Sequence, residues 1–304
     1  MDGIINVYKE AGFTSHDVVA KLRGICRQKK IGHTGTLDPQ ATGVLPVCLG
    51  SATRACEMLT DRTKEYVAEL LLGKITDTQD TTGTVLEERE VAVDEAQVRE
   101  VIGNFVGGYD QIPPMYSALK VNGKKLYELA RAGKEVERQA RHVDLPAIEI
   151  LEIRLPVVKF RVECSKGTYI RSLCADIGGK LGCGGTMQSL VRTRVGEFRL
   201  TDALTLTQLQ ELRDTGRLEE ALLPTDRIFA DFNAVHVEEK WRKLIDNGNA
   251  FYPGQTMEQT TYPVGEWVRV YREDDSFVGI YAYDGAKEWY KPVKIFPSNT
   301  ESRK

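Results

Sequence analysis

Short apolar or alternating runs predict strands in the first two-thirds of the chain. Residues 3–8 (GIINVY) are predicted to form a short strand, and residues 66–72 are a second candidate. Residues 157–164 alternate between apolar and polar positions, which is the period of a half-buried strand. A further strand is predicted at residues 195–200.

Three segments have the features of helices. Ser15 is the predicted N-cap of the first helix, because its hydroxyl can accept a hydrogen bond from the first turn. One face of this helix carries apolar residues at helical spacing: Val18, Leu22 and Ile25. Asp94 is the predicted cap of a second helix that runs to about Phe105. Residues 167–181 (GTYIRSLCADIGGKL) are predicted to form the third.

Glycine and proline mark two further segments. Residues 31–50 contain five of these residues among their first sixteen positions, which predicts an ordered loop that leads into a strand. Residues 107–141 contain a Pro-Pro break and one short helical pattern. They are therefore predicted to be a basic insertion that emerges from the core.

The composition changes toward the C-terminus. Twelve of the 24 aromatic residues lie in the last 64 positions. Three strand-like runs in this part, GEWVRVY, SFVGIYAY and EWYKPVKIF, are separated by turns. We therefore expect two domains, a large one at residues 1–235 and a small β-rich one at residues 236–304. The final SNTESRK is predicted to be disordered.

The charges are nearly balanced, with 41 basic and 44 acidic residues and a net charge of −3, which argues weakly against a nucleic-acid partner. Their distribution is uneven, however. Residues 18–37 contain no acid and five cations, and residues 116–141 contain seven cations and three acids. Two such zones are compatible with one face that binds a polyanion, or simply with solvated surface, and charge alone does not decide between them.

Several classes of protein are disfavoured by the sequence. No apolar run approaches the roughly 18 residues of a membrane span, and the N-terminus lacks the layout of a signal peptide, so a cytoplasmic protein is expected. No C-x-x-C pair or nearby histidine gives a zinc spacing, so no metal is expected. The six cysteines are interpreted as reduced thiols: Cys26, Cys48, Cys56, Cys164, Cys174 and Cys183.

The most conspicuous candidate for chemistry is Asp38, in GHTGTLDPQATGVLPV. A carboxylate among glycines and before a proline lies on a rigid loop that a ligand can approach, although on this segment alone an Asx-turn is the favoured explanation. His33 lies five residues earlier and suggests acid–base chemistry, but the chain has no G-x-S-x-G elbow and no Walker A motif. Serine-hydrolase and nucleotide-triphosphate chemistry are therefore disfavoured.

Five segments in this order carry a family resemblance: GHTGTLDPQATGVLPV, KEYVAELLLGKITDTQD, QIPPMYSALKVNGKKLYELARAG, CSKGTYIRSLCADIGGKLG and LVRTRVGEF. Over residues 3 to about 200 the chain resembles the TruB family of tRNA pseudouridine synthases. The first motif departs from the family, which usually has Lys-Pro where this chain has Lys9 and Glu10. We expect this difference to change a turn and not the chemistry.

The resemblance implies a reaction and three catalytic residues. The family isomerises uridine 55 in the T-loop of tRNA to pseudouridine, without a cofactor or metal. Asp38 matches the catalytic aspartate, and Arg171 matches the arginine that keeps this carboxylate ionised and aimed. Tyr66 matches the tyrosine that stacks on the extruded base, although a half-buried strand tyrosine would have the same pattern.

The resemblance also implies substrate-binding residues. His33 matches a histidine near the vacated space in the T-loop, and Leu190 matches an apolar residue beneath the base. A hydrogen-bonding loop histidine and ordinary core packing remain alternatives for these two residues. Tyr169 would line the pocket, on the face of Arg171 if this segment is a strand. Lys124 and Lys125 belong to the insertion, which resembles the RNA-gripping thumb of the family.

The family fold is α+β, with a mixed, mostly antiparallel central sheet flanked by helices and an inserted thumb. The C-terminal domain is expected to be PUA-like. The expected partner is the T-arm of tRNA, and a monomer without an obligate protein partner is expected. Two alternatives remain, a subunit of an RNA-guided pseudouridine synthase and a non-catalytic tRNA-binding or tRNA-folding protein.

Overall fold

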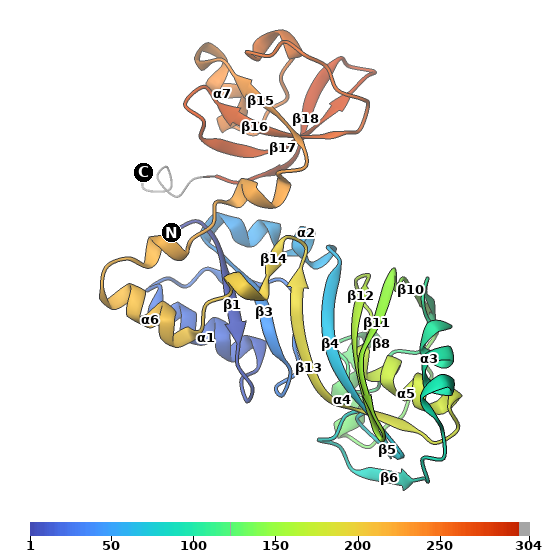
Figure 1. Cartoon of the computed structure of the whole chain (residues 1–304). Coiled ribbons are helices and arrows are strands. Elements are labelled where there is room, and N and C mark those ends of the chain that lie inside the picture. Colours follow the sequence, from blue (N-terminus) through green and yellow to red (C-terminus); the bar gives the residue numbers. More distant parts are fainter. Residues whose placement is uncertain (122, 298–304) are drawn as a thin grey trace.

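A sheet of eight strands forms the centre of the computed structural model, which describes residues 1–121 and 123–297. Its strands are β1 Gly3–Lys9, β2 Ile31–His33, β3 Thr42–Leu49, β4 Lys64–Leu72, β11 Ala147–Arg154, β12 Val157–Cys164, β13 Gly185–Val195 and β14 Phe198–Arg199. Figure 1 shows the order β1–β3–β13–β4–β12–β11. In addition, β2 pairs with β3, and β14 pairs with β13. β3 and β13 run parallel, and the other described pairs of this sheet are antiparallel. The predicted mixed, mostly antiparallel sheet is therefore confirmed.

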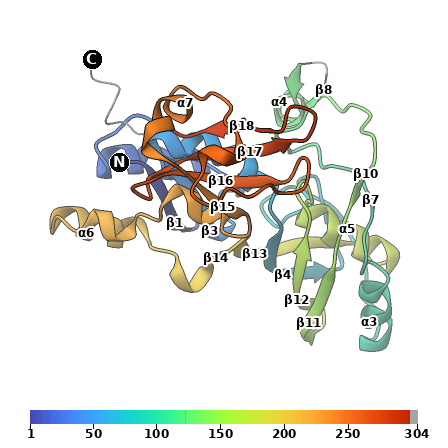
Figure 2. The same ribbon diagram turned by 90° about the horizontal axis from the view of Figure 1, so that it is seen from above.

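Two groups of helices pack on this sheet (Figures 1 and 2). α1 (Ser15–Ile25) and α6 (Leu206–Asp214) share an apolar core with β1 and β3. α3 (Glu95–Gly103) and α5 (Ile170–Lys180) share a second core with β4 and β12. The three predicted helices are therefore present, and Asp94 caps α3 as predicted, since its side chain accepts a hydrogen bond from the backbone of Gln97.

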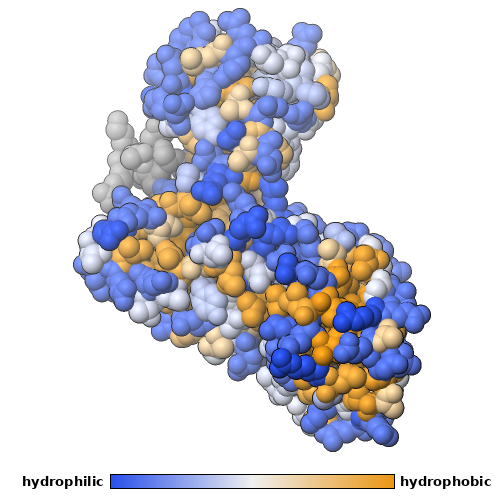
Figure 3. Space-filling model, viewed as in Figure 1, coloured by the Kyte–Doolittle hydropathy of each residue, from blue (hydrophilic) through white to orange (hydrophobic). Residues whose placement is uncertain are grey.

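Alternation along β4 and β12 explains why these strands could be predicted. In β4, buried residues that pack toward α5 alternate with half-buried residues on the opposite face. Figure 3 shows apolar side chains gathered on the side of the molecule formed by β4, β12 and β11, where Leu151 and Leu155 are exposed. Burial of one face of a sheet produces this period of two.

The predicted N-cap of α1 was wrong by one residue. Thr14, with an extended backbone, accepts a hydrogen bond from the backbone N–H of Asp17 through its hydroxyl, and the Asp17 carboxylate accepts one from the Thr14 N–H. This reciprocal capping box satisfies two free donors at the helix start. Ser15 is instead buried, and its hydroxyl contacts a different part of the chain.

The predicted strand at residues 195–200 was also wrong. β13 ends at Val195, and a turn at Gly196, with a positive φ of 53°, leads into the two-residue strand β14. Val195 and Phe198 face each other across this hairpin. The long strand β13 was not predicted, because its residues GTMQSLVRTRV lack regular alternation.

The insertion leaves and rejoins the core at one place. β7 (Tyr109–Gln111) and β10 (Arg141–Val143) pair side by side at its base, with Gln111 opposite Arg141. Between them lie the short strands β8 (Lys120–Val121) and β9 (Lys124–Lys125) and the helix α4 (Leu126–Arg131). Figure 2 shows α4 and β8 projecting beyond the central sheet.

The C-terminal part contains a second sheet, of four strands in the order β15–β16–β17–β18. Its strands are β15 Asn233–Val237, β16 Trp267–Arg272, β17 Phe277–Asp284 and β18 Trp289–Ile295. The three predicted strand-like runs correspond to β16, β17 and β18, whereas β15 was not predicted. The segment SNTESRK lies outside the described residues.

The two sheets share an apolar core. Ile280 and Phe296 of the C-terminal part are buried in one cluster with Ile4 and Val44 of the central sheet and with Phe229 of the connecting segment. None of the helices in residues 1–121 and 123–297 is both long and apolar enough to cross a membrane.

Candidate active site

Asp38 lies on the loop of residues 34–41, which connects β2 to β3, and Lys9 at the end of β1 holds this loop. The Lys9 ammonium donates to the carbonyl oxygens of Ala41 at 2.6 Å, Pro39 at 3.0 Å and Glu10 at 3.2 Å. Its three N–H groups thus bind three carbonyls, which is the full donor capacity of a lysine. Burial lowers the pKa of Lys9 to about 8.

Ser15 fixes the other side of the same loop. Its buried hydroxyl accepts a hydrogen bond from the backbone N–H of Leu37 at 2.9 Å. Leu37 is itself 4% exposed and packs in the core beside Tyr66 and Leu190. The residue before Asp38 is therefore anchored both by a buried polar contact and by apolar packing.

Arg171 pairs with Asp38 from the first turn of α5. The Nε atom of Arg171 lies 2.9 Å from one carboxylate oxygen of Asp38, and the Nη2 atom lies 3.4 Å from the other. This two-point arrangement aims the carboxylate as well as neutralising it. The Arg171 side chain is 7% exposed and that of Asp38 is 39% exposed, so the carboxylate can be reached while its partner cannot.

Two backbone carbonyls and a second carboxylate complete the surroundings of Arg171. Its Nη2 atom donates to the carbonyl of Tyr116 at 2.8 Å, and its Nη1 atom donates to the carbonyl of Thr78 at 3.2 Å. A carboxylate oxygen of Asp80 lies 3.9 Å from Nη1. One arginine therefore joins the Asp38 loop, the turn before β6 (Val85–Glu88) and the insertion.

Opposing influences act on the Asp38 carboxyl. Burial raises its pKa above the usual range, and the nearby negative charge of Asp80 acts in the same direction. The positive charges of Arg171 and Lys9 favour the ionised form and limit this rise. The geometry therefore provides a partly desolvated carboxylate whose charge depends on its cationic partners.

Tyr66 lies in the middle of β4, between Val162 of β12 and Arg192 of β13. It is 8% exposed and belongs to the same core cluster as Leu37 and Leu190. Burial raises the pKa of its hydroxyl, which is therefore neutral near pH 7. The ring is thus part of an apolar wall next to the Asp38 loop.

His33 stands at the end of β2, half-buried, one residue before this loop. Its ring meets that of His16 edge to face, with 5.2 Å between the ring centres, and its Nδ1 atom accepts a hydrogen bond from the Gly35 N–H. Burial lowers the pKa of His33 to about 4, so the ring is neutral at physiological pH. His33 is therefore an uncharged ring beside the loop of Asp38.

Tyr169 is the N-cap of α5 and not a strand residue, so the predicted strand relationship to Arg171 was wrong. The helix begins at Ile170, and Arg171 is in its first turn. Tyr169 is half-buried, and burial raises the pKa of its hydroxyl. Leu190 is 9% exposed in β13 opposite Ala68 of β4, which places it in the wall that contains Tyr66.

Lys124 and Lys125 lie apart from this cluster, in the hairpin of the insertion. Lys124 is exposed, and the Lys125 ammonium lies 5.4 Å from the ring centre of Tyr127 and 3.3 Å from its hydroxyl. In residues 1–121 and 123–297 neither lysine forms a salt bridge, and the five cations of the 18–37 zone form none either. These cations therefore have no salt-bridge partner among the described residues.

Sequence reasoning missed four residues that hold the site: Lys9, Ser15, Asp80 and Arg192. Arg192 is 1% exposed and donates to the carbonyls of Val44 at 2.7 Å and Gly35 at 3.1 Å. Lysine and arginine are almost never fully buried without a partner. A charged residue inside an apolar strand, as in GIINVYK, is the signal that could have identified Lys9.

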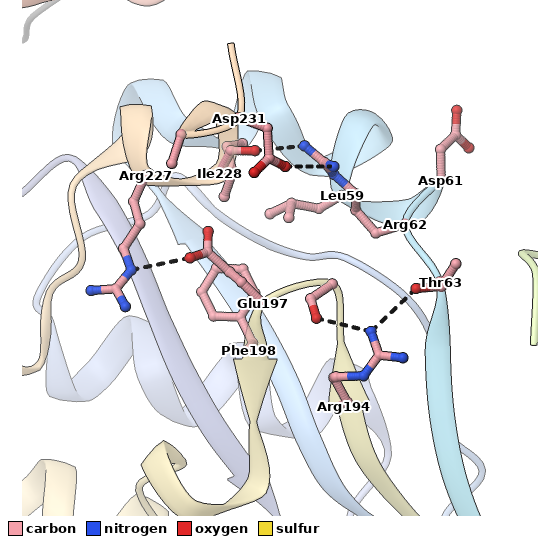
Figure 4. Close-up of a pocket in the computed structure, with 12 residues that line it drawn as sticks. Leu59, Asp61, Arg62, Thr63, Arg194, Glu197, Phe198, Arg227, Ile228 and Asp231 are labelled. Carbon is pink, nitrogen blue, oxygen red and sulfur yellow. Dashed lines mark hydrogen bonds and ion pairs between the residues drawn. The ribbon is translucent and has the colours of Figure 1, made fainter. Parts of the chain in front are cut away.

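A separate hollow of about 470 Å³ lies between α2 (Cys56–Thr60), the β13–β14 hairpin and the segment before β15. Figure 4 shows that its arginines are already bonded: Arg62 to Ile228 and Asp231, Arg227 to Glu197, and Arg194 to Thr63. The described residues that line it include none of the predicted site residues. This hollow is therefore separate from the candidate active site around Asp38.

Comparison with known proteins gives the family. Residues 23–170 match the N-terminal domain of TruB family pseudouridylate synthases, and residues 171–230 match the C-terminal domain of tRNA pseudouridylate synthase B. The chain is 53% identical to tRNA pseudouridine synthase B of Lachnoclostridium phytofermentans, over 97% of this chain and 100% of that protein. The chain belongs to the TruB family.

Further relatives and solved structures agree with this membership. The tRNA pseudouridine synthase B of Alkaliphilus oremlandii is 48% identical over 97% of each chain. A crystal structure of a Cbf5–Nop10–Gar1 complex matches 97% of this chain and 85% of that chain, with 29% identity and a TM-score of 0.74. An H/ACA RNP bound to a substrate RNA containing 2'-deoxyuridine matches at 27% identity over 98% of this chain and 86% of that chain, with the same TM-score. The predicted pseudouridine synthase fold is confirmed.

Among residues 1–121 and 123–297, no group of three or more His, Cys, Asp or Glu side chains is placed to hold a metal ion. The six cysteines are free thiols, five of them buried and Cys56 half-buried.

Proposed function

We propose that this protein isomerises uridine 55 in the T-loop of tRNA to pseudouridine, with Asp38 as the nucleophile. The observation that carries this proposal is the two-point ion pair between Asp38 and Arg171, in a chain of the TruB family. A half-exposed carboxylate beside a buried arginine is suited to attack on a substrate that comes from outside. The reaction is an isomerisation, and we expect it to need no cofactor or metal.

The wall beside Asp38 suits a base that has left its stack. Extrusion of a nucleotide costs a few kcal/mol, and stacking on an aromatic ring returns about 1–3 kcal/mol. We assign the stacking role to Tyr66 and the apolar floor to Leu190, which pack in one cluster beside the loop of Asp38. We assign Tyr169, the N-cap residue of α5, to the lining of the same site.

His33 and the two basic zones are assigned to the rest of the RNA. The neutral ring of His33 would fill the space that the extruded nucleotide leaves in the T-loop. Lys124 and Lys125 would meet phosphates, because they lie on a projecting hairpin and have no acidic partner among the described residues. The 18–37 zone would extend this contact.

The domain organisation is part of the proposal. Residues 1–235 would carry the catalytic function, with residues 107–141 as the thumb, and residues 236–304 would form a PUA-like domain. We further propose that the protein acts as a monomer without a protein partner. The full-length match to tRNA pseudouridine synthase B proteins supports this independence.

The purified protein, with a chelator and no other RNA or protein, should convert uridine 55 of an unmodified tRNA transcript. Pseudouridine would be mapped along the whole transcript. Asp38→Asn, checked for deamidation, should give no product and bind tRNA within a few-fold of the wild type. Asp94→Asn is the matched control and should retain activity, because asparagine caps a helix about as well as aspartate.

Each alternative has its own outcome in this assay. Product that forms only after a guide RNA and partner proteins are added would identify an RNA-guided enzyme. Tight tRNA binding by the wild type without any product would identify a tRNA-binding or tRNA-folding protein. Full turnover by Asp38→Asn would exclude Asp38 as the nucleophile.

A further inference from the structure

Gln111 connects the base of the insertion to the start of α5 through a side chain that is 1% exposed. Its Oε1 atom accepts a hydrogen bond from the backbone N–H of Tyr169 at 2.8 Å, and its Nε2 atom donates to the Tyr169 carbonyl at 3.0 Å. One amide thus binds both polar groups of one residue, as a neighbouring strand would. Reversing the amide would place donor against donor, so the contact is specific.

The Gln111 amide binds the N–H of the N-cap residue of α5, the contact that the side chain at the third helical position makes in a capping box. Tyr169 is the N-cap of α5, and no side chain within the helix start caps it. The free N–H groups at the start of a helix need partners, and a missing cap costs about 1 kcal/mol. Gln111 supplies a partner at this point from a distant part of the chain. Arg171 follows two residues later, in the first turn of the helix. The position of Tyr169 therefore also determines the position of the Arg171 backbone, from which its side chain extends.

The same insertion also holds the other end of Arg171. The Tyr116 carbonyl, five residues after Gln111, accepts from the Nη2 atom of Arg171 at 2.8 Å. Nη2 and Nε are the two atoms that face the Asp38 carboxylate. The backbone before Arg171 and the guanidinium of Arg171 are therefore both held by residues 111–116 of the insertion.

Further hydrogen bonds hold the Gln111 amide in this position. Its Nε2 atom also donates to the Tyr109 hydroxyl at 2.6 Å, and that hydroxyl donates to Asp176 of α5 at 2.8 Å. The network thus reaches α5 at two points, Tyr169 and Asp176. A shift of the insertion at Gln111 would be transmitted to the helix that carries Arg171.

We propose that Gln111 is a positioning residue that couples the insertion to the ion pair between Arg171 and Asp38. It touches neither reacting atom, and it acts by fixing where Arg171 lies. The inference rests on the proposed function, in which Asp38 is the nucleophile. Binding of the insertion to RNA would then change the orientation and the ionisation of the Asp38 carboxylate through this amide.

Gln111→Met tests the proposal, because methionine keeps the length and apolar volume of the side chain and removes its hydrogen bonds. The charged groups that face Asp38 are Arg171 of α5, Asp80 of the turn before β6 and Lys9 of β1. If Arg171 is displaced, Asp38 loses its closest countercharge. Carbon-13 NMR titration of the Asp38 carboxyl in the free protein should then give a pKa about one pH unit higher.

The second readout is the single-turnover rate at saturating tRNA. We expect at least a tenfold lower rate, with tRNA affinity within about threefold, because the lost interaction acts on the transition state. Gln97→Met is the matched control: Gln97 also accepts from the N-cap N–H of a helix, at 2.9 Å in α3, away from the site. This control should leave both readouts unchanged.

An unchanged Asp38 titration in Gln111→Met would overturn the inference, whether or not the rate falls, since a fall alone would be structural. A changed titration with an unchanged rate would also overturn it. If the wild type itself makes no pseudouridine, the proposed function fails, and the titration still decides whether Gln111 controls the ion pair. If Gln111→Met does not fold, Gln111→Asn, whose amide is one methylene too short, carries the same expectations.

Discussion

The hydroxyl of Ser15, at the start of α1, accepts a hydrogen bond of 2.9 Å from the backbone N–H of Leu37, 22 residues later in the chain. This contact joins the first helix to the residue that precedes Asp38. Both partners are buried, so water cannot replace either group if the other is removed. The first helix is therefore part of the framework of the catalytic loop.

Ser15→Ala should lower both stability and activity. The buried Leu37 N–H would lose its partner, which costs about 1–3 kcal/mol in the free energy of unfolding. The loop of Asp38 would lose one anchor, and kcat should fall several-fold with little change in tRNA affinity. Chemical denaturation and single-turnover kinetics measure the two effects. Thr14→Ala, which removes the cap of the same helix, should cost about 1 kcal/mol and leave kcat unchanged.

Arg171→Met should shift the pH dependence of the chemical step. The reaction needs ionised Asp38, and Arg171 favours that form, so its loss raises the carboxyl pKa further. The ionised fraction at a given pH falls, and the acid limb of the kcat profile moves to higher pH. Activity should therefore be lowest in acid and recover partly as the pH rises. Arg194→Met is the control: it removes the 2.7 Å ion pair with Glu163 and should leave the pH profile unchanged. If Arg171→Met is inactive at every pH, Arg171 has a structural role instead.

Two substitutions separate the ring of Tyr66 from its hydroxyl. Tyr66→Phe keeps the stacking surface and should preserve most of the affinity for tRNA. Tyr66→Leu removes the ring and should weaken the complex that precedes chemistry, by up to about 1–3 kcal/mol. Equilibrium binding to a tRNA whose target uridine cannot react measures this difference. Equal binding by both variants, with turnover lost in both, would show that the hydroxyl matters more than the ring.

The double variant Lys124→Ala, Lys125→Ala should reduce the salt dependence of tRNA binding. If about five phosphates are neutralised by the wild type, log affinity should fall against log salt with a slope of roughly −3 to −4. Loss of these two cations should make the slope shallower by about one to two units, with the chemical step at saturation nearly unchanged. The same changes at Arg154 and Arg161, on the exposed face of β11 and β12, should leave the slope unaltered. An unaltered slope in the lysine variant would mean that these residues are only solvated surface.

Local patterns predicted the elements whose burial follows a regular period. β4 and β12 alternate because one of their faces is covered, and α3 begins directly after Asp94 because this acidic side chain caps it. β13 could not be predicted in this way, since buried and half-buried positions along it are irregular and its register shifts twice against β4.

The site depended on information that local patterns do not contain. Asp38 and Arg171 are 133 residues apart, and their pairing was expected only from the family resemblance. The further partners of Arg171 include the carbonyls of Thr78 and Tyr116, and a backbone oxygen has the same chemistry at every residue. Ser15 was assigned a local role because a serine before a helical run is a common cap, but tertiary packing turned its hydroxyl toward Leu37.

Ile280 and Phe296, from the C-terminal sheet, are buried in the same cluster as Ile4 and Val44 of the central sheet. Removal of the C-terminal part would therefore expose apolar surface of β1 and β3, and the remaining chain would be less soluble and less stable. The shared cluster also means that both sheets should lose their structure in one cooperative thermal transition. The shared core also holds the C-terminal sheet against the central sheet, so an RNA that contacted both sheets would meet two surfaces at a set separation.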